Sequence, residues 1–466
     1  MILRLLAWLV VTLAIGWAAV MVVWPGPVRW KSGETLLRGS LAVGLGFGIS
    51  SCAFFVAMVL LGPTRLAAFG ADAVALAALI ALARSRAHSL PADRYRLPNA
   101  PAPDTLDRQI GWGIVALTGV AAVATLAVSM RMPHGDWDAW GIYNLTARFI
   151  YLGGSHWHRA FTPGLGIHPD YPLLLPGSVV RGWLYTGSAS SIVPAIAGML
   201  FAYALAGLVA GGVWILRGRR HAAAAAMVLI GTPFFLTASA SQYADLPLTL
   251  FFVGAIVLYA LARRLRDDET WMLIGSGLCA GLAAWTKNEG LLFVLIACAG
   301  LFVLHHRVRR RGPDRRVLAA FLWGLVPVLV VVGFFKLTLA PPNDLVSGQG
   351  SGTLPRLVDA SRYWLIVSSG LRFLLHFPVI PVVILLALAG LDRDAGDRRA
   401  KRLAAYIVLA MAAGYFTVYL TTPLDLALQI HRSLDRLIMQ LWPLALFVAF
   451  MALRLPEQAA AAGAGS

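Results

Sequence analysis

The chain has 466 residues, of which 59% are hydrophobic and only 13% are charged, and its formal net charge at pH 7 is +17. Apolar runs of about twenty residues recur along its whole length, which indicates a polytopic α-helical membrane protein and excludes a sizeable soluble domain. The Lys and Arg residues lie in short loops between the apolar runs. Membrane topology explains them better than binding to nucleic acid does.

The pattern predicts an all-α bundle of about thirteen transmembrane helices, with interfacial helices in its external loops. The first apolar segment has no cleavage site after a short apolar core, so we expect a retained helix. The region 356–391 also fits a surface helix followed by a span. The predicted spans cover residues 4–24, 40–62, 65–84, 111–130, 190–216, 222–240, 246–262, 271–286, 290–305, 317–340, 374–391, 403–421 and 437–454.

Three regions follow from these spans. Residues 1–110 hold N-terminal transmembrane helices and a cytoplasmic loop, and residues 111–454 form a transmembrane core. Within that core, residues 131–188 mix acids, imidazoles and aromatic side chains, and they are too polar to span a bilayer. We expect this stretch to be an external loop on the membrane surface. Residues 455–466 are predicted to be a disordered cytoplasmic tail.

Few polar groups interrupt the apolar segments. Cys52, Cys279 and Cys298 all lie inside such segments, where a free cysteine behaves as a small hydrophobic residue. We therefore expect no disulfide and no zinc site. Asp72 lies within the third predicted span, and an ionisable residue there is a functional candidate. Because it is near one end of the span, we expect its carboxylate to snorkel to the membrane surface.

Lys and Arg are unevenly divided between two alternating sets of loops. The set that includes Arg309-Arg310-Arg311 and Arg398-Arg399 holds 26 of the 39 residues, although the loops of the other set are longer. The positive-inside rule places the first set in the cytoplasm. The 131–188 loop and the polar clusters described next then share the external face, which suggests one site built from distant loops.

Two aspartates, Asp136 and Asp138, follow the fourth predicted span and flank Trp137, with Trp140 close behind. A carboxylate among indoles at headgroup depth is partly desolvated, which raises its proton affinity and suits a general base. Asp138 and Asp136 are therefore the candidate catalytic residues. The alternative is that both aspartates cap a helix and both tryptophans belong to an aromatic belt.

Residues 138–152 form a plausible interfacial helix with an acid near its N-terminus. Its predicted apolar stripe consists of Ile142, Leu145, Phe149 and Leu152.

His168-Pro169-Asp170-Tyr171-Pro172 is a second polar cluster in the same loop. The two prolines fix an extended turn, and the other three side chains offer hydrogen bonds suited to sugar hydroxyls or phosphate. A purely structural turn is the alternative.

Charged residues also appear where later predicted spans begin or end. Lys287 and Glu289 interrupt an apolar stretch, either as a neutralised hairpin turn or with Lys287 against a lipid phosphate. Asp245 begins another span, as a cap or as part of a carboxylate cluster. Mg²⁺ or Mn²⁺ could bind Asp136, Asp138 and Asp245 through oxygen atoms, although no cofactor is required.

A cationic patch precedes the last predicted span. His431, Arg432 and Arg436 are spaced at one helical turn, and the guanidinium fork of arginine matches a phosphate. Asp435 is expected to pair with one of these arginines.

Several of these segments together resemble the polytopic glycosyltransferases of the GT-C fold, over about residues 111–450. More narrowly, they resemble bacterial members of the dolichyl-phosphate-mannose protein mannosyltransferase and aminoarabinose transferase superfamily. The segments are Trp137-Asp138-Ala139-Trp140, Arg148, His168-Pro169-Asp170-Tyr171-Pro172, Tyr243-Ala244-Asp245, Lys287-Asn288-Glu289-Gly290 and residues 431–436.

The resemblance implies a sugar donor on a polyprenyl-phosphate carrier, an external catalytic Asp and inversion at the anomeric carbon. On that pattern Asp138 is the base and Asp136 the second choice, while Lys287, Arg432 and Arg436 hold the donor phosphate. The better-known relatives place an adjacent Asp-Glu after the first span, whereas here Asp-Trp-Asp follows the fourth.

We therefore expect a hexosyl- or pentosyltransferase in the bacterial inner membrane, with its active site facing the periplasm. Its partners would be the lipid-linked donor, a glycan, lipid or protein acceptor, and membrane lipids. A secondary transporter, which should show an internal repeat, and a lipid-linked polysaccharide polymerase or ligase are the alternatives. The predicted substrate-binding residues are Arg148, His168, Asp170, Tyr171, Asp245, Lys287, Glu289, His431, Arg432 and Arg436.

Overall fold

The computed structural model describes residues 1–24, 33–88, 104–165, 167–264, 269–306, 315–343, 347–350, 352–392 and 398–454. The predicted tail and Arg309-Arg310-Arg311 lie outside these residues. The helices within them are α1 (Ile2–Val23), α2 (Gly33–Leu61), α3 (Arg65–His88), α4 (Thr105–Arg131), η1 (Ala139–Tyr143), α5 (Asn144–Gly153), η2 (Gly154–Phe161), α6 (Leu174–Thr186), α7 (Ile192–Arg217), α8 (Arg219–Ile230), α9 (Pro233–Ala240), α10 (Asp245–Arg264), α11 (Glu269–Thr286), α12 (Asn288–His306), α13 (Arg315–Thr338), α15 (Thr353–Val358), α16 (Ala360–Leu374), α17 (Val379–Ala389), α18 (Arg398–Thr421) and α19 (Leu426–Ala452).

Among the described residues, nine helices are long and apolar enough to cross a membrane, or eleven if each of two bent pairs is one span. Two further apolar helices, α11 and α12, are shorter. Each predicted span overlaps one of these helices or pairs, which confirms an all-α polytopic membrane protein. The predicted number of thirteen spans is not confirmed.

The two bent pairs fall at prolines. Helices α8 and α9 meet at an angle of 67°, where Pro233 begins α9. Helices α16 and α17 meet at 73°, and Pro378 immediately precedes α17. A proline lacks the N–H that would continue a helix, so both bends follow from the sequence.

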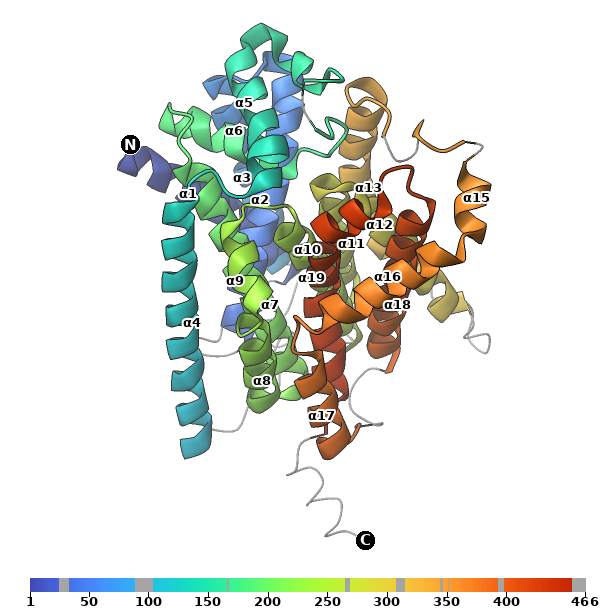
Figure 1. Ribbon diagram of the computed structural model, residues 1–466. Coiled ribbons are helices and arrows are strands. Elements are labelled where there is room, and N and C mark those ends of the chain that lie inside the picture. Colours follow the sequence, from blue (N-terminus) through green and yellow to red (C-terminus); the bar gives the residue numbers. More distant parts are fainter. Residues whose placement is uncertain are drawn as a thin grey trace.

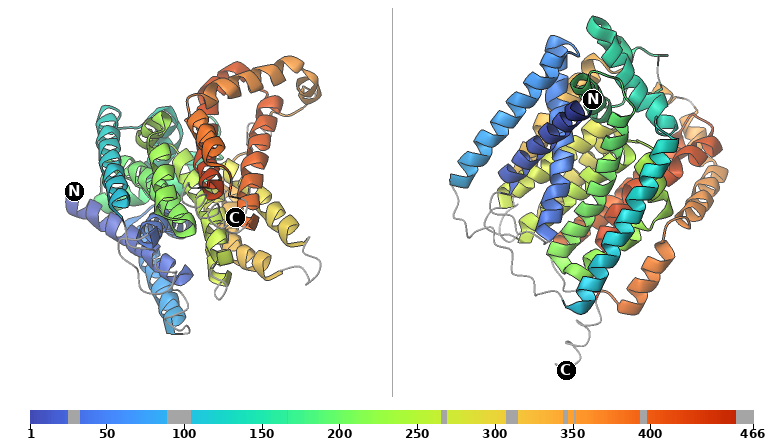
Figure 2. Two further views of the ribbon diagram at one scale, coloured as in Figure 1. Left: turned by 90° about the horizontal axis from the view of Figure 1, so that it is seen from below. Right: turned by 90° about the vertical axis from the view of Figure 1, so that its left-hand side faces the viewer.

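Figure 1 shows η1, α5, η2 and α6 gathered at one end of the bundle, which we call the loop end, and the C-terminal end of α19 toward the opposite end. Helix α10 forms the core of the bundle, since all its residues from Asp245 to Ala262 are buried. It packs against α7, α11 and α19. Helices α1 and α3 lie to one side, and α16 to α18 to the other (Figure 2).

Asp72 does not snorkel to the membrane surface, contrary to the prediction. It is buried, and both of its carboxylate oxygens accept hydrogen bonds from the Nε of Arg181 on α6, at 2.8 and 2.9 Å. The hydroxyl of Tyr185 donates to it at 2.6 Å, and Arg181 Nη2 donates to Thr12 of α1 at 2.8 Å. Because the bundle supplies the opposite charge, the carboxylate stays inside. These contacts join α6 to α1 and α3.

Helices α11 and α13 touch through a pair of glycines. A Cβ atom built on Gly324 would lie 1.8 Å from the carbonyl oxygen of Ile274, and one on Gly277 would lie 1.8 Å from that of Phe321. Small residues let membrane helices approach this closely. The close packing holds α11, whose C-terminal end leads into the functional site.

We predict that Gly324→Ala lowers the apparent melting temperature of the purified protein, since overpacking a membrane helix interface costs about 1–3 kcal/mol. Gly333→Ala is the matched control on the same helix, because a Cβ there meets no atom within 4 Å. It should leave the melting temperature unchanged or raise it. Equal melting temperatures for the two variants would contradict the proposed close contact.

Candidate functional site

Asp245 lies at the centre of a group of charged side chains at the loop end. One of its carboxylate oxygens accepts hydrogen bonds from Lys287 Nζ at 3.0 Å and from Gln440 Nε2. The other accepts from Arg436 Nε at 3.0 Å and Nη2 at 2.9 Å. Only 4% of the Asp245 side chain is exposed. Its position at the N-terminus of α10 adds the favourable field of the helix dipole.

Two more carboxylates extend the group. Arg436 Nη2 lies 2.6 Å from Asp138 Oδ2, and Lys287 Nζ lies 2.8 Å from Glu289 Oε1. We call Asp138, Asp245, Lys287, Glu289 and Arg436 the charge network. It holds three carboxylates and two cations, and it carries one excess negative charge when all five groups are ionised. Lys287 thus pairs with Glu289, as expected for a hairpin turn, and also with Asp245, as expected for a larger site.

Lys287 stays protonated in this setting. Burial by itself lowers the pKa of its amine, but the carboxylates of Asp245 and Glu289 outweigh burial and hold the pKa well above its ordinary value. Lys287 is therefore positively charged at the loop end. Arg436 is positively charged as well, because an arginine keeps its proton in proteins.

Helix α19 supplies Arg436 and Gln440 from one face, one helical turn apart. The region 425–436 was expected to precede the last span, but α19 begins at Leu426 and continues without a break. The difference arises because the carboxylate of Asp425 caps the helix, accepting from the N–H of Leu428. The guanidinium of Arg436 also lies 4.3 Å from the ring centre of Tyr243.

The connection between α4 and η1 is tied to the segment before α10. The N–H of Asp136 donates to the carbonyl of Ser241 at 3.2 Å, and Asn144 Nδ2 donates to Gln242 Oε1 at 2.9 Å. Gly135 has a φ of +74°, and a Cβ there would lie 2.6 Å from the Ser241 oxygen. These contacts bring Asp138 beside Asp245 although the two residues are far apart in sequence.

The predicted helix over 138–152 exists in two parts, because the chain forms one π-helical turn, η1, before α5 begins at Asn144. Of the predicted apolar stripe, Ile142 is buried, Leu145 and Phe149 are half-buried, and Leu152 is 67% exposed. That the stripe faces a membrane stays a prediction. The residues that this segment buries are Ala139, Gly141, Ile142, Tyr143, Ala147 and Ile150.

Of the two candidate bases, only Asp138 belongs to the charge network. Its side chain is 15% exposed. Asp136 is exposed, and one of its oxygens accepts from the N–H of Trp137 at 2.7 Å. Trp137 and Trp140 are about half exposed and meet edge to face, with ring centres 4.4 Å apart.

Asp170 lies in a separate buried cluster beside the charge network. Its carboxylate accepts from Asn288 Nδ2 at 2.7 Å and from Asn343 Nδ2 at 2.8 Å. The amine of Lys336 donates to the backbone carbonyl of Asp170 and, at 2.7 Å, to Asn288 Oδ1. This cluster fastens the loop to α12 and α13, which favours a structural part for Asp170.

His168 and Tyr171 belong to the same turn. Their rings stack, with centres 4.8 Å apart, and His168 has a φ of +52°. The ring of Tyr171 in turn lies 6.3 Å from that of Tyr143.

The structure does not bring Arg148, His431 and Arg432 into contact with the charge network. All three are exposed, Arg148 on α5 and the other two on α19. Arg432 nevertheless lies one helical turn before Arg436.

Asp136, Asp138 and Asp245 do not form a metal-ligand set. Among the residues that the structure describes, no group of three or more His, Cys, Asp or Glu side chains converges as ligands. Both oxygens of Asp245 contact cationic or amide nitrogens instead. Metal dependence stays a prediction.

Sequence reasoning missed Gln440 and Tyr143. Gln440 is fully buried in α19 and contacts Asp245. The signal for it was present, since it is a polar residue in an apolar stretch four positions after Arg436. Tyr143 has no such signal, because tyrosine is common at membrane interfaces.

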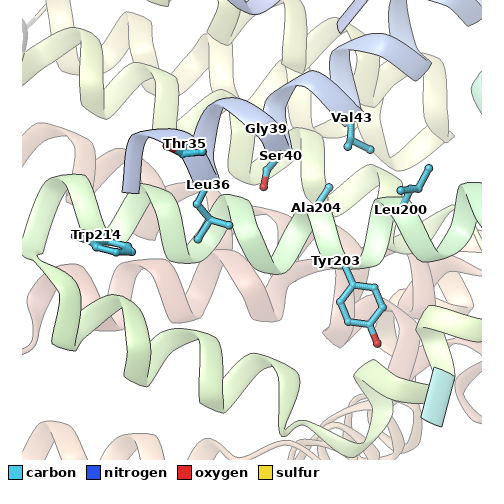
Figure 3. A pocket seen from close by; sticks show the side chains of 9 residues that line it. All are labelled: Thr35, Leu36, Gly39, Ser40, Val43, Leu200, Tyr203, Ala204 and Trp214. Atoms are coloured by element: carbon cyan, nitrogen blue, oxygen red, sulfur yellow. The ribbon is translucent and has the colours of Figure 1, made fainter. Parts of the chain in front are cut away.

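A groove of about 660 Å³ lies apart from the charge network, between α2 and α7 (Figure 3). Its lining contains no Asp, Glu, Lys or Arg side chain, so none of the charged candidate residues lies here. The lining residues are Thr35, Leu36, Gly39, Ser40, Val43, Leu200, Tyr203, Ala204 and Trp214.

Comparison with known proteins supports the resemblance. Residues 182–334 match the family described as Dolichyl-phosphate-mannose-protein mannosyltransferase. Two curated proteins of Mycolicibacterium smegmatis, from strains ATCC 700084 / mc(2)155 and MKD8, are both named Polyprenol-phosphate-mannose--protein mannosyltransferase. Each is 25% identical over 285 residues, which is 51% of this chain and 52% of the relative. The predicted resemblance is confirmed.

The matches have limits in length. The chain spans about half the length of the curated relatives it matches. The family match includes Asp245, Lys287 and Glu289, while Asp138 and Arg436 lie outside it. No solved structure matches the chain significantly.

We predict that Asp245→Asn destabilises the protein by about 3–5 kcal/mol, because it leaves two buried cations without their shared carboxylate. Thermal unfolding of the purified protein measures this effect. Asp136→Asn changes an exposed aspartate in the same loop and should shift the melting temperature little. A normal melting temperature for Asp245→Asn would show that Asp245 does not hold the network together.

Proposed function

We propose that this protein is a membrane glycosyltransferase that moves a sugar from a polyprenyl-phosphate carrier to an acceptor hydroxyl. The observation that carries the proposal is the charge network, in which a carboxylate shares an arginine with a second, buried carboxylate at the head of α10. It supplies a base and two phosphate-binding cations within one site. The match to the mannosyltransferase family favours a transferase over a transporter or a polymerase.

The cations would hold the donor phosphate. Arg436 offers a planar fork that suits two phosphate oxygens, and Lys287 offers a point charge. Arg432 is exposed one helical turn before Arg436, nearer the N-terminus of α19. It would meet the lipid phosphate as the donor enters. As the sugar–phosphate bond breaks, these charges stabilise the polyprenyl phosphate that leaves.

Asp138 would act as the general base. In the structure it shares Arg436 with Asp245, and the guanidinium occupies one of the Asp138 carboxylate oxygens. A donor phosphate that competes for Arg436 would free Asp138 at the moment when a base is needed. The phosphate and Asp138 are both anions and would repel each other, so Asp138 would move away from Arg436 once the phosphate binds it.

The reaction then balances as follows. Asp138 accepts the proton of the acceptor hydroxyl, the hydroxyl oxygen bonds to the anomeric carbon, and the bond from that carbon to the phosphate oxygen breaks. The products are an inverted glycoside and polyprenyl phosphate. The latter is a fair leaving group, so the step requires no metal.

The names of the relatives suggest the substrates, and the distribution of Lys and Arg suggests the side of the membrane. Their printed name gives polyprenol-phosphate-mannose as the donor and protein as the acceptor, so we propose mannose and a protein hydroxyl here. The charge network lies opposite the C-terminal end of α19, at the end of the bundle that the Lys and Arg distribution assigns to the external side. We therefore propose the periplasmic face of a bacterial inner membrane.

We predict that Asp138→Asn lowers transfer by about 10²–10⁴-fold, which is the usual contribution of a general base. Membranes that contain the variant would receive radiolabelled polyprenyl-phosphate-mannose, and label in the protein fraction would be counted. Asp104→Asn, an exposed aspartate at the opposite end of the bundle, is the control. Asp136→Asn decides between the two candidate bases, and a larger loss there than at Asp138 would reverse the assignment.

We predict that Arg436→Lys raises the donor KM about tenfold or more, because it keeps the charge but loses the second hydrogen bond to an anion. Initial rates at a series of donor concentrations measure this. Arg220→Lys, near the other end of the bundle, should leave the KM unchanged. An unaltered KM for Arg436→Lys would remove this arginine from the phosphate site.

A further inference from the structure

Tyr143 is a buried polar side chain that no part of the site has so far explained. It is the last residue of η1 and is only 1% exposed. Its hydroxyl is buried and makes no hydrogen bond to another protein atom. Burying a hydroxyl without a partner costs free energy, and native proteins usually avoid it.

The surroundings of this hydroxyl are charged. Asp245, Asp138, Tyr171 and Lys287 all act on it electrostatically. Conversely, Tyr143 is among the groups that act on Lys287 and Arg436. The hydroxyl is therefore within electrostatic range of the two cations and the two aspartates of the charge network.

Tyr143 can serve as a donor but not as an anion. Burial raises the pKa of its phenol well above the usual value, so the hydroxyl keeps its proton at physiological pH. A neutral donor has an advantage here, since the charge network already has three carboxylates against two cations. A neutral hydroxyl can donate a hydrogen bond to an anion, and it does not need a carboxylate of the protein to balance a charge of its own.

The local backbone explains why the side chain points inward. Helix η1 is a single π-helical turn, and such turns are frequent at functional sites. Asp138 is the residue just before this turn, and Tyr143 is its last residue. The same turn thereby presents both a base and a donor to the charge network.

We propose that Tyr143 donates a hydrogen bond to the phosphate of the polyprenyl-linked substrate, beside Lys287 and Arg436. This inference rests on the proposed function. The hydroxyl would contact an oxygen of the phosphate in the donor and again in the polyprenyl phosphate product. Tyr143 is thus a third phosphate ligand, which the sequence does not reveal.

The test is Tyr143→Phe in the full-length protein, purified in detergent. The substitution removes a hydroxyl that has no protein partner, so the melting temperature should stay the same or rise. Binding of radiolabelled polyprenyl phosphate should weaken by about tenfold or more, because a hydrogen bond to a charged group is lost.

Tyr185→Phe is the matched control. Its hydroxyl has a protein partner, since it donates to Asp72 at 2.6 Å, well away from the charge network. This variant should melt at a lower temperature and bind polyprenyl phosphate as the wild type does.

Each outcome decides the proposal. Unchanged binding of polyprenyl phosphate by Tyr143→Phe would overturn the proposal. If the melting temperature also fell, the hydroxyl would have a structural role instead. Saturable binding by the wild type in either case would leave the proposed function standing. If the wild type neither binds polyprenyl phosphate nor transfers the sugar, the proposed function fails, and the assignment of Tyr143 fails with it.

Discussion

The site depends on one buried carboxylate, Asp245, at the N-terminus of the central helix. A lone carboxylate inside a membrane bundle is costly, and Asp245 is stable there because Lys287 and Arg436 both bind it. Each cation comes from a different part of the chain. The ion pairs therefore join α10 to the α11–α12 turn and to α19, and the same contacts place two cationic side chains on one carboxylate.

The rest of the fold holds this arrangement at the loop end. Asp170, with Asn288 and Lys336, fastens the turn at residues 168–172 to α12 and α13. The buried pair of Asp72 and Arg181 joins α6 to the N-terminal helices. The extra N-terminal helices thus support the loop that carries the site, which gives them a structural purpose.

The same charges that stabilise the bundle shape the proposed chemistry. Arg436 serves two carboxylates, and only one of them, Asp138, lies at the rim of the site with partial exposure. A substrate phosphate that competes for the guanidinium would act first on this more exposed contact. The more buried Asp245 therefore stabilises the bundle, while the more exposed Asp138 is the residue proposed to react.

The sequence by itself determined the helical class, the approximate spans and the acidic loop after α4, because these depend on local hydrophobicity and charge. It named Lys287 and Arg436, but also Arg148, His431 and Arg432, which lie outside the charge network. It left open whether Asp136 or Asp138 faces the site, and it placed Asp72 at the surface. Only the tertiary structure decided these points, since the partners are remote: Arg181 is 109 residues from Asp72, and Arg436 is 191 residues from Asp245. The inward orientation of Tyr143 also depends on a π-helical turn that no local pattern predicts. Local periodicity fixes which face of a helix is apolar, whereas the pairing of buried charges is fixed by how the helices pack.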